Sequence, residues 1–199
     1  MVASLVKPEL KLADRYDFIN NIYKRLSGGL YVGFNNAIYL SEREAADRNF
    51  ALGHYMKENN CFPADTDLVS SLEFYFQLCS LETKPDAHAV MAATLANGGI
   101  CPITGEQVLS NDSVKHTLSL MLSCGMYDYS GQFAFKIGLP AKSGVSGAII
   151  LVIPNVMGMV IYSPRLDEHG NSHKGLVFCE KLLRYMYIFP MFDIMNNLS

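Results

Sequence analysis

The spacing of apolar residues changes near Gly125, and this change limits the folds open to the chain. Before it, apolar side chains recur every three or four residues, which is the period of an amphipathic helix. After it, "AIILVIPNVMGMVIY" holds two short apolar runs rich in Val and Ile, separated by Pro154 and Asn155. Such runs are typical of buried strands in a hairpin. Helices first and strands last, without strand–helix–strand alternation, predict an α+β protein that is mostly helical and has a C-terminal antiparallel hairpin.

Capping residues and glycines bound most of the predicted helices. Ser41 and Glu44 form a capping box, which predicts the start of the second helix because their side chains can satisfy backbone N–H groups reciprocally. Two strands alone make a poor sheet, so we expect either unseen pairing partners or a fold that is incomplete at its N-terminus. The predicted helices are 14–26, 41–58, 66–79, 87–96, 112–123 and 174–185, and the predicted strands are 142–153 and 156–162.

Composition points to a globular chain whose partners are small or neutral. Of the 199 residues, 50% are apolar and 18% are charged, which allows a sizeable core. The net charge is −3 and no basic cluster occurs, so we expect no binding to nucleic acid. Proline, asparagine and glycine interrupt the longest apolar stretch, so we expect no membrane span. The five histidines and five cysteines follow no metal-ligand spacing, and no metal site is predicted.

Lys142, Ser143, Gly144 and Val145 form the first candidate for chemistry. They offer an ammonium group, a hydroxyl group and a glycine that lets backbone N–H groups approach an oxyanion closely. Enzymes that recognise penicillin keep a similar triplet at a strand edge, so a serine enzyme acting on β-lactams is one interpretation. An ordinary turn into a strand is another.

Tyr127 is the second candidate, because it follows the helix that ends at Gly125 and precedes Lys142 in the same region. A lysine ammonium beside a phenol lowers the pKa of the phenol, which would make Tyr127 a usable general base. The alternative is that Tyr127 and Tyr129 are half-buried packing residues, as most tyrosines are.

Glu42 and Asn49 are two helical turns apart on the predicted second helix, so they would share one face. A carboxylate and an amide on one face can hold the two ends of a small zwitterion. The alternative for Glu42 is a carboxylate in the first helical turn, stabilised by the helix dipole. Tyr75 taken alone is typical of a core residue.

Together these residues lie in long stretches that resemble the serine-dependent, β-lactamase-like glutaminases of the animal kidney and liver type. The resemblance covers about residues 2–183 and predicts a partial catalytic domain over 1–183, with a divergent tail over 184–199. The stretches that carry it are "YVGFNNAIYLSEREAADRNFALGHYMKENNCFP", "LEFYFQLCS", "VMAATLANGGICPITGEQVLS", "TLSLMLSCGMYDYSGQFAF", "GLPAKSGVSGAIILVIPNVMGM" and "SPRLDEHGNSHKG".

The resemblance implies a β-lactamase/transpeptidase-like fold and hydrolysis of L-glutamine to L-glutamate and ammonia through a serine acyl-enzyme. It implies no metal or organic cofactor. It also implies a homo-oligomer, specifically a tetramer, a mitochondrial location, and activation by inorganic phosphate. No targeting peptide is visible in this chain.

The resemblance also assigns roles to individual residues. Glu42 would meet the α-amino group of glutamine, Asn49 would meet its α-carboxylate, and Tyr75 would donate its hydroxyl to the bound substrate. Tyr127 would transfer protons to and from the nucleophile and the leaving ammonia, close to Lys142. The backbone N–H of Val145 would be one oxyanion donor.

The chain offers no nucleophile at the position that such a site requires. The family's Ser-x-x-Lys lies far upstream of the segment that matches Glu42, whereas the match here is Ser4-Leu5-Val6-Lys7, close to Met1. We therefore expect the isolated chain to be inactive. The alternative is a non-catalytic short isoform that assembles with full-length glutaminase through "DRNFALGHYMKE", which resembles the family's subunit-contact segment.

Overall fold

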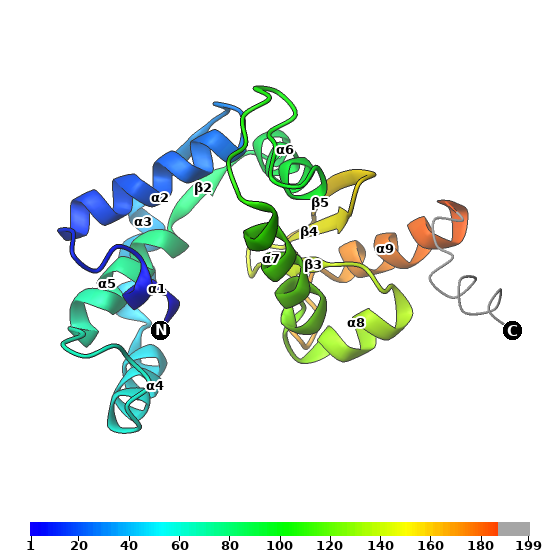
Figure 1. The fold of residues 1–199 in the computed structure, drawn as a ribbon. Helices are drawn as coiled ribbons and strands as arrows, with labels where there is room; N and C mark the ends of the chain where they lie inside the picture. The colour runs from blue at the N-terminus through cyan, green and yellow to red at the C-terminus, as the bar shows by residue number, and fades with distance from the viewer. Residues whose placement is uncertain (187–199) are drawn as a thin grey trace, which may run out of the picture. The chain divides into compact units, whose positions relative to one another are not determined.

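The computed structural model describes residues 1–186, with side chains through Leu182. The chain divides into two compact units, residues 1–87 and the residues from His88 onward, and each is described by itself (Figure 1). Both units combine helices with a small antiparallel sheet, so the α+β prediction is confirmed. Within the described residues, no helix combines the length and the apolar character needed to cross a membrane.

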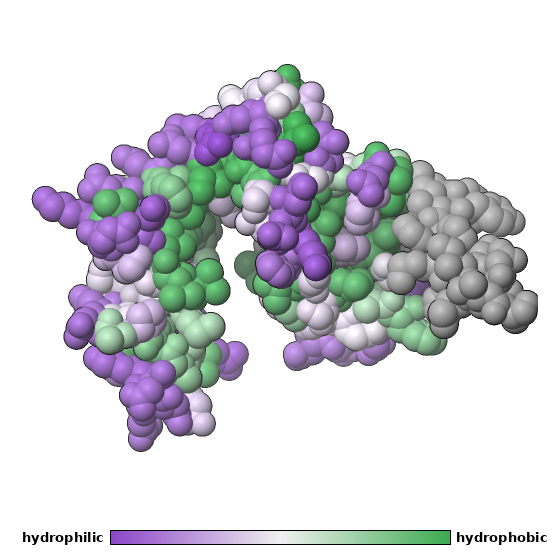
Figure 2. All heavy atoms as spheres, in the orientation of Figure 1, coloured by the Kyte–Doolittle hydropathy of each residue, from purple (hydrophilic) through white to green (hydrophobic). Residues whose placement is uncertain are grey.

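The first unit is a group of helices with a two-stranded antiparallel sheet. Its strands pair so that Gly33 lies opposite Glu82. The side chains of Phe74 and Phe76 are fully buried. Figure 2 shows hydrophobic residues along one side of this unit. Its elements are α1 (Val2–Leu5), α2 (Leu12–Leu26), β1 (Val32–Phe34), α3 (Asn36–Glu44), α4 (Asp47–Glu58), α5 (Leu68–Cys79) and β2 (Leu81–Thr83).

Helix α2 ends at Leu26, the predicted end of the first helix. Gly28 and Gly29 both have positive φ, a conformation that glycine adopts without steric cost. The N–H of Gly29 donates to the carbonyl of Lys24, and the N–H of Gly28 donates to the carbonyl of Arg25. These two bonds satisfy carbonyls that the end of a helix leaves open.

The predicted second helix, 41–58, is wrong in both its start and its continuity. Asn35 begins α3 six residues earlier than Ser41, because its side-chain oxygen accepts hydrogen bonds from the N–H groups of Ala37 and Ile38. Ser41 therefore lies inside a helix and caps nothing. The chain leaves helical geometry between α3 and α4, at residues 45–46.

The second unit contains a three-stranded antiparallel sheet in the order β3-β4-β5. Its first helix, α6, begins at Pro85, at the junction between the units. The other elements are α7 (Asn111–Cys124), a 3₁₀ helix η1 (Tyr127–Tyr129), α8 (Ser130–Lys136), β3 (Ala141–Ser143), β4 (Ala148–Ile153), β5 (Met157–Tyr162) and α9 (His173–Met186), and α6 itself spans Pro85–Ala96.

The predicted strand 142–153 is two strands in the structure. The N–H of Gly147 donates to the carbonyl of Gly144, and Gly147 has a φ of +90°, so the chain reverses between them. Lys142 consequently lies on β3, opposite Ile150 on β4. The turn at Pro154-Asn155 is confirmed, because β4 and β5 pair on either side of it.

The core of the second unit lies around the sheet, with contributions from α8 and α9. Leu118 and Met121 of α7 pack inward, whereas Leu122 is exposed. The core residues include Met126, Phe133, Leu139, Ala141, Ile149, Leu151, Ile153, Leu176 and Cys179. At the C-terminal end, α9 runs past the predicted boundary at residue 183. Residues 187–199 of the predicted tail lie outside the described residues.

Candidate active site

Glu42 and Asn49 lie on different helices, α3 and α4, so the prediction that they share one helix face is wrong. The helix break at residues 45–46 separates them. Asn49 and Tyr75 nevertheless line one hollow of the first unit, with a volume of about 360 Å³. Most of its remaining lining is apolar, from Met1, Val2, Ala3, Leu52, Gly53, Met56, Phe62, Leu68 and Leu72, and Ser71 adds a hydroxyl group.

Tyr75 is on the surface, since 42% of it is exposed, and the expectation of a core residue is wrong. Its neighbour one turn later on α5 is Cys79. Burial raises the pKa of the Cys79 thiol, a hydrogen bond with Tyr75 opposes this shift, and the negative charge of Glu42 adds to it. Sequence reasoning missed Cys79 as a site neighbour. Its spacing of four residues from Tyr75 was the available signal.

In the second unit, Lys142 lies against Tyr127, with its Nζ atom 4.7 Å from the centroid of the tyrosine ring. The proximity agrees with the sequence prediction, but the direction of the pKa shift does not. Burial raises the pKa of the Tyr127 phenol, and desolvation lowers the pKa of the Lys142 ammonium. The reason is geometric: the ammonium lies over the ring, where it makes a cation–π contact, so the cost of burial dominates.

Tyr127 has a backbone conformation that is rare for a bulky residue, with a φ of +53°. Ser130 stabilises this turn, because its hydroxyl donates to the carbonyl of Tyr127 and accepts from the N–H of Met126, at 2.6 and 2.9 Å. The buried amide of Asn171 donates to the carbonyl of Met126. Several contacts therefore fix a strained conformation, a feature that often accompanies functional sites.

Val145 lies in the turn between β3 and β4 and is 70% exposed. Its backbone N–H makes no hydrogen bond with any described residue, so it remains available to an oxyanion. On the adjacent strand, the N–H of Ser143 donates to the carbonyl of Gly125 at 2.9 Å. This bond ties the Lys-Ser-Gly triplet to the end of α7.

Ser4 and Lys7 are engaged with other groups. The hydroxyl of buried Ser4 donates to the carbonyl of Met1 at 2.6 Å. The Nζ atom of Lys7 lies 3.9 Å from the carboxylate of Glu9 and 5.5 Å from the ring centroid of Phe18. Neither contact couples the hydroxyl of Ser4 to the amine of Lys7.

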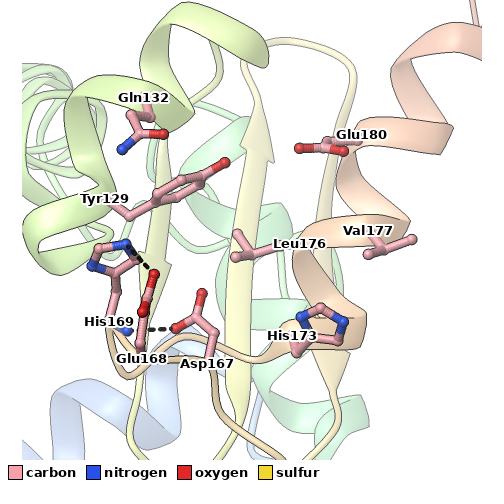
Figure 3. A pocket seen from close by; sticks show the side chains of 9 residues that line it. All are labelled: Tyr129, Gln132, Asp167, Glu168, His169, His173, Leu176, Val177 and Glu180. Carbon is pink, nitrogen blue, oxygen red and sulfur yellow. Dashed lines mark hydrogen bonds and ion pairs between the residues drawn. The ribbon is translucent and has the colours of Figure 1, made fainter.

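A further hollow, of about 500 Å³, lies in the second unit between α9 and the residues around His169 (Figure 3). The rings of Tyr129 and His169 stack there with centroids 5.6 Å apart, and the Nζ atom of Lys136 donates to the hydroxyl of Tyr129. None of the predicted site residues lines this hollow. Across residues 1–186, no group of three histidine, cysteine or acidic side chains has the arrangement of a metal site.

Comparison with known proteins identifies the family of the chain. The glutaminase family model matches residues 1–189. The chain is 57% identical over 197 residues to the mitochondrial liver isoform of glutaminase from Rattus norvegicus, which covers 99% of this chain and 33% of that protein. It is 46% identical over 163 residues to a glutaminase of Nostoc sp., covering 81% of this chain and 48% of that protein.

Among solved structures, a Bacillus glutaminase crystallised in 4.3 M NaCl matches with a TM-score of 0.87 and 34% identity, over 94% of this chain and 64% of that chain. This likeness confirms the predicted β-lactamase-like fold class. The chain spans about a third of the length of the liver isoform and about half of the Nostoc protein. By the family model and these identities, the chain belongs to the glutaminase family.

Proposed function

We propose that this chain takes part in the hydrolysis of L-glutamine to L-glutamate and ammonia through a serine acyl-enzyme. Family membership supports the reaction. The observation that carries the proposal to this chain's own residues is the contact of Lys142 with Tyr127, together with the unpaired N–H of Val145 three residues after Lys142. These groups supply a proton donor, a cation and an oxyanion donor, which acyl transfer requires. No metal or organic cofactor has a step in this scheme.

In the first unit, three residues would recognise the amino-acid end of glutamine. The carboxylate of Glu42 would pair with the α-amino group, and the amide of Asn49 would donate to the α-carboxylate. The exposed hydroxyl of Tyr75 would donate to the bound substrate. Glu42 has no ion-pair partner among the described residues, so its carboxylate is available to a ligand ammonium group.

In the second unit, the raised pKa of Tyr127 keeps its phenol protonated near neutral pH. Tyr127 would pass this proton to the amide nitrogen as the C–N bond breaks and ammonia leaves, and it would take up the proton that the hydroxyl of the nucleophile loses. Lys142, whose pKa is lowered, would stabilise the phenolate that results. The N–H of Val145 would stabilise the tetrahedral oxyanion, an interaction whose loss typically costs about 10²–10³-fold in rate.

Ser4 is not the nucleophile in this proposal, because its hydroxyl donates to the carbonyl of Met1 and Lys7 lies beside Glu9. We expect the purified 199-residue chain to release no ammonia from L-glutamine above background. A coupled glutamate dehydrogenase assay measures this. Turnover that is abolished by Ser4→Ala would contradict the assignment.

Ligand binding tests the site without turnover. We expect L-glutamine to shift the NMR signals of residues near Glu42, Asn49 and Tyr75, and an analogue that lacks the α-amino group to bind more weakly. Glu42→Gln should remove that preference, since a neutral amide does not pair with an ammonium group. Equal binding of both ligands to the unsubstituted protein would contradict the role of Glu42.

A second candidate function is that of a non-catalytic subunit that joins full-length glutaminase, or copies of itself, through α4. Tyr55 of α4 is 65% exposed, and Leu52 is exposed as well, whereas Phe50 packs against Phe76. Large exposed apolar side chains favour a protein partner. Co-expression with a full-length glutaminase, followed by size-exclusion chromatography, tests this. Separate peaks would dismiss the idea.

The remaining expectations belong to the same proposal. The name of the rat relative supports a mitochondrial location, and family resemblance supports activation by inorganic phosphate and assembly as a homo-oligomer. Only the Lys-Ser-Gly triplet supports the alternative that the chain acts on β-lactams. An absence of nitrocefin hydrolysis would exclude that alternative.

A further inference from the structure

Helix α3 carries Glu42 but has no buried side chain. In this respect α3 differs from α5, which buries the side chains of Leu68, Phe74 and Phe76. A helix without a buried face gains little from apolar packing, and a nine-residue helix is not stable alone. Polar contacts, together with the packing of the Tyr39 ring against Phe34, therefore determine where α3 lies, and with it the position of Glu42.

Glu73 of α5 provides the central contact. One carboxylate oxygen accepts a hydrogen bond from the hydroxyl of Tyr39 at 2.6 Å, and the other accepts from the Nε atom of Arg43 at 2.9 Å. Tyr39 and Arg43 are one turn apart on α3, so Glu73 grips one face of that helix with both oxygens. Its side chain is 20% exposed and that of Arg43 is 49% exposed, which shields the pair partly from water. The bond to Glu73 raises the pKa of Tyr39.

Glu82 of β2 holds the start of the same helix. Its carboxylate accepts from the amide of Asn35 at 3.1 Å and from the hydroxyl of Tyr31 at 2.6 Å. Asn35 uses its other side-chain atom to cap α3. Two carboxylates from neighbouring elements thus hold α3, and Glu73 is the one nearer to Glu42.

Glu73 and its partner Arg43 also lie close in sequence to the predicted ligand contacts of this unit. Arg43 directly follows Glu42, and Glu73 is two residues before Tyr75 on α5. Near Glu42, Cys79 contacts Tyr75. A shift of α3 along α5 would therefore change the distance from Glu42 to Tyr75. Because the guanidinium group of Arg43 pairs with Glu73, it does not pair with Glu42.

We propose that Glu73 is a positioning residue for ligand binding: by holding Tyr39 and Arg43, it fixes Glu42 where it can meet the α-amino group of the ligand. This role rests on the proposed function. It predicts a specific defect, since losing Glu73 weakens recognition of the α-amino group and leaves the remaining ligand contacts in place.

The test uses Glu73→Gln in the full chain, because glutamine keeps the shape and still accepts from Tyr39 but loses the charge that holds Arg43. We expect hydrogen exchange of the backbone amides in 36–44 to speed up about fivefold, as the loss of a partly shielded ion pair implies. We expect the Kd for L-glutamine to rise by a similar factor and the Kd for the analogue without the α-amino group to stay the same. Tyr39→Phe, which removes one bond and no charge, should give a smaller effect in the same direction.

Glu180→Gln is the matched control. It removes the Lys136–Glu180 pair, 3.6 Å apart in the second unit, and should change neither the exchange of α3 nor the binding. Equal weakening of both ligands by Glu73→Gln, or no weakening of either, would overturn the positioning role alone. No binding of L-glutamine to the unsubstituted protein would overturn the proposed function and this role together.

Discussion

The two units hold their candidate residues in different ways. In the first unit, Glu42 is on α3, which buries no side chain and is held by two carboxylates. In the second unit, Lys142 is on β3 between two buried residues, and Tyr127 follows the buried Met126. A residue held by the core should tolerate the loss of any single surface charge, whereas a residue held by ion pairs should not. The comparison predicts where substitutions change stability and where they change binding.

The largest expected effect is on the stability of the second unit, where the core holds the candidate residues. A Cβ atom added at Gly125 would lie 1.7 Å from the carbonyl oxygen of Ala141, so α7 and β3 must separate. We expect Gly125→Ala to destabilise the second unit by about 3–5 kcal/mol, the range of severe single substitutions. Gly131→Ala is the control, because nothing lies within 4 Å of its added Cβ atom, and alanine favours the helix there. Similar urea midpoints for the two variants would contradict the packing described for Gly125.

A smaller effect is expected at the turn that carries Tyr127. Ser130→Ala leaves the N–H of Met126 and the carbonyl of Tyr127 without their shared partner. The cost should be about 1–3 kcal/mol, as for other buried polar groups that lose a hydrogen bond. Ser119→Ala, at an exposed serine of α7, should cost close to nothing. Chemical denaturation measures both, and equal stabilities would show that Ser130 does not stabilise the turn.

The sequence predicted this second region well because its signals are local. The Val- and Ile-rich runs and the Pro154-Asn155 turn follow from neighbouring residues, although the turn inside the predicted strand 142–153 was missed. The contact of Tyr127 with Lys142 joins residues 15 positions apart and was expected from their place in one region and from the family resemblance. The direction of the Tyr127 pKa shift was wrong, because it depends on where the ammonium group lies over the ring. Sequence spacing does not carry that information.

The first region was harder to predict because two capping signals competed. Ser41 and Glu44 fit a capping box, but Asn35 begins the helix upstream, and the chain breaks at residues 45–46. The contacts of Glu73 and Glu82 join residues 30 to 51 positions apart, so no local pattern could reveal them. The roles of Glu42, Asn49 and Tyr75 came from family resemblance and remain predictions.

The next smaller effect concerns Asn35, which caps the N-terminus of α3. Asn35→Ala removes the acceptor for the N–H groups of Ala37 and Ile38 and the donor to Glu82. Loss of such a cap typically costs about 1 kcal/mol, and we expect the cost to be local to α3. Hydrogen exchange of 36–44 measures it, with Asn59→Ala at the exposed asparagine just after α4 as the control. Unchanged exchange in Asn35→Ala would contradict the role of the cap.

The smallest expected effect is a dependence on pH. Hydrogen bonds from Tyr31 and Asn35 lower the pKa of Glu82, so the ionised form is favoured in the folded protein. The stabilisation is therefore present above the ordinary carboxyl pKa and is lost as the pH falls through the lowered value. Between about pH 6 and about pH 3, α3 should lose protection in the unsubstituted protein, and Glu82→Gln should lose less over that interval. Identical losses would exclude Glu82 as the titrating group.

Native-state hydrogen exchange of the unsubstituted chain tests the comparison most directly. The amides of α3, 36–44, should exchange through a local opening of low free energy, whereas those of β4, 148–153, should exchange only when the second unit unfolds. Added L-glutamine should slow exchange in α3 more than the analogue without the α-amino group does. Equal protection of α3 and β4, together with no slowing by L-glutamine, would contradict the account.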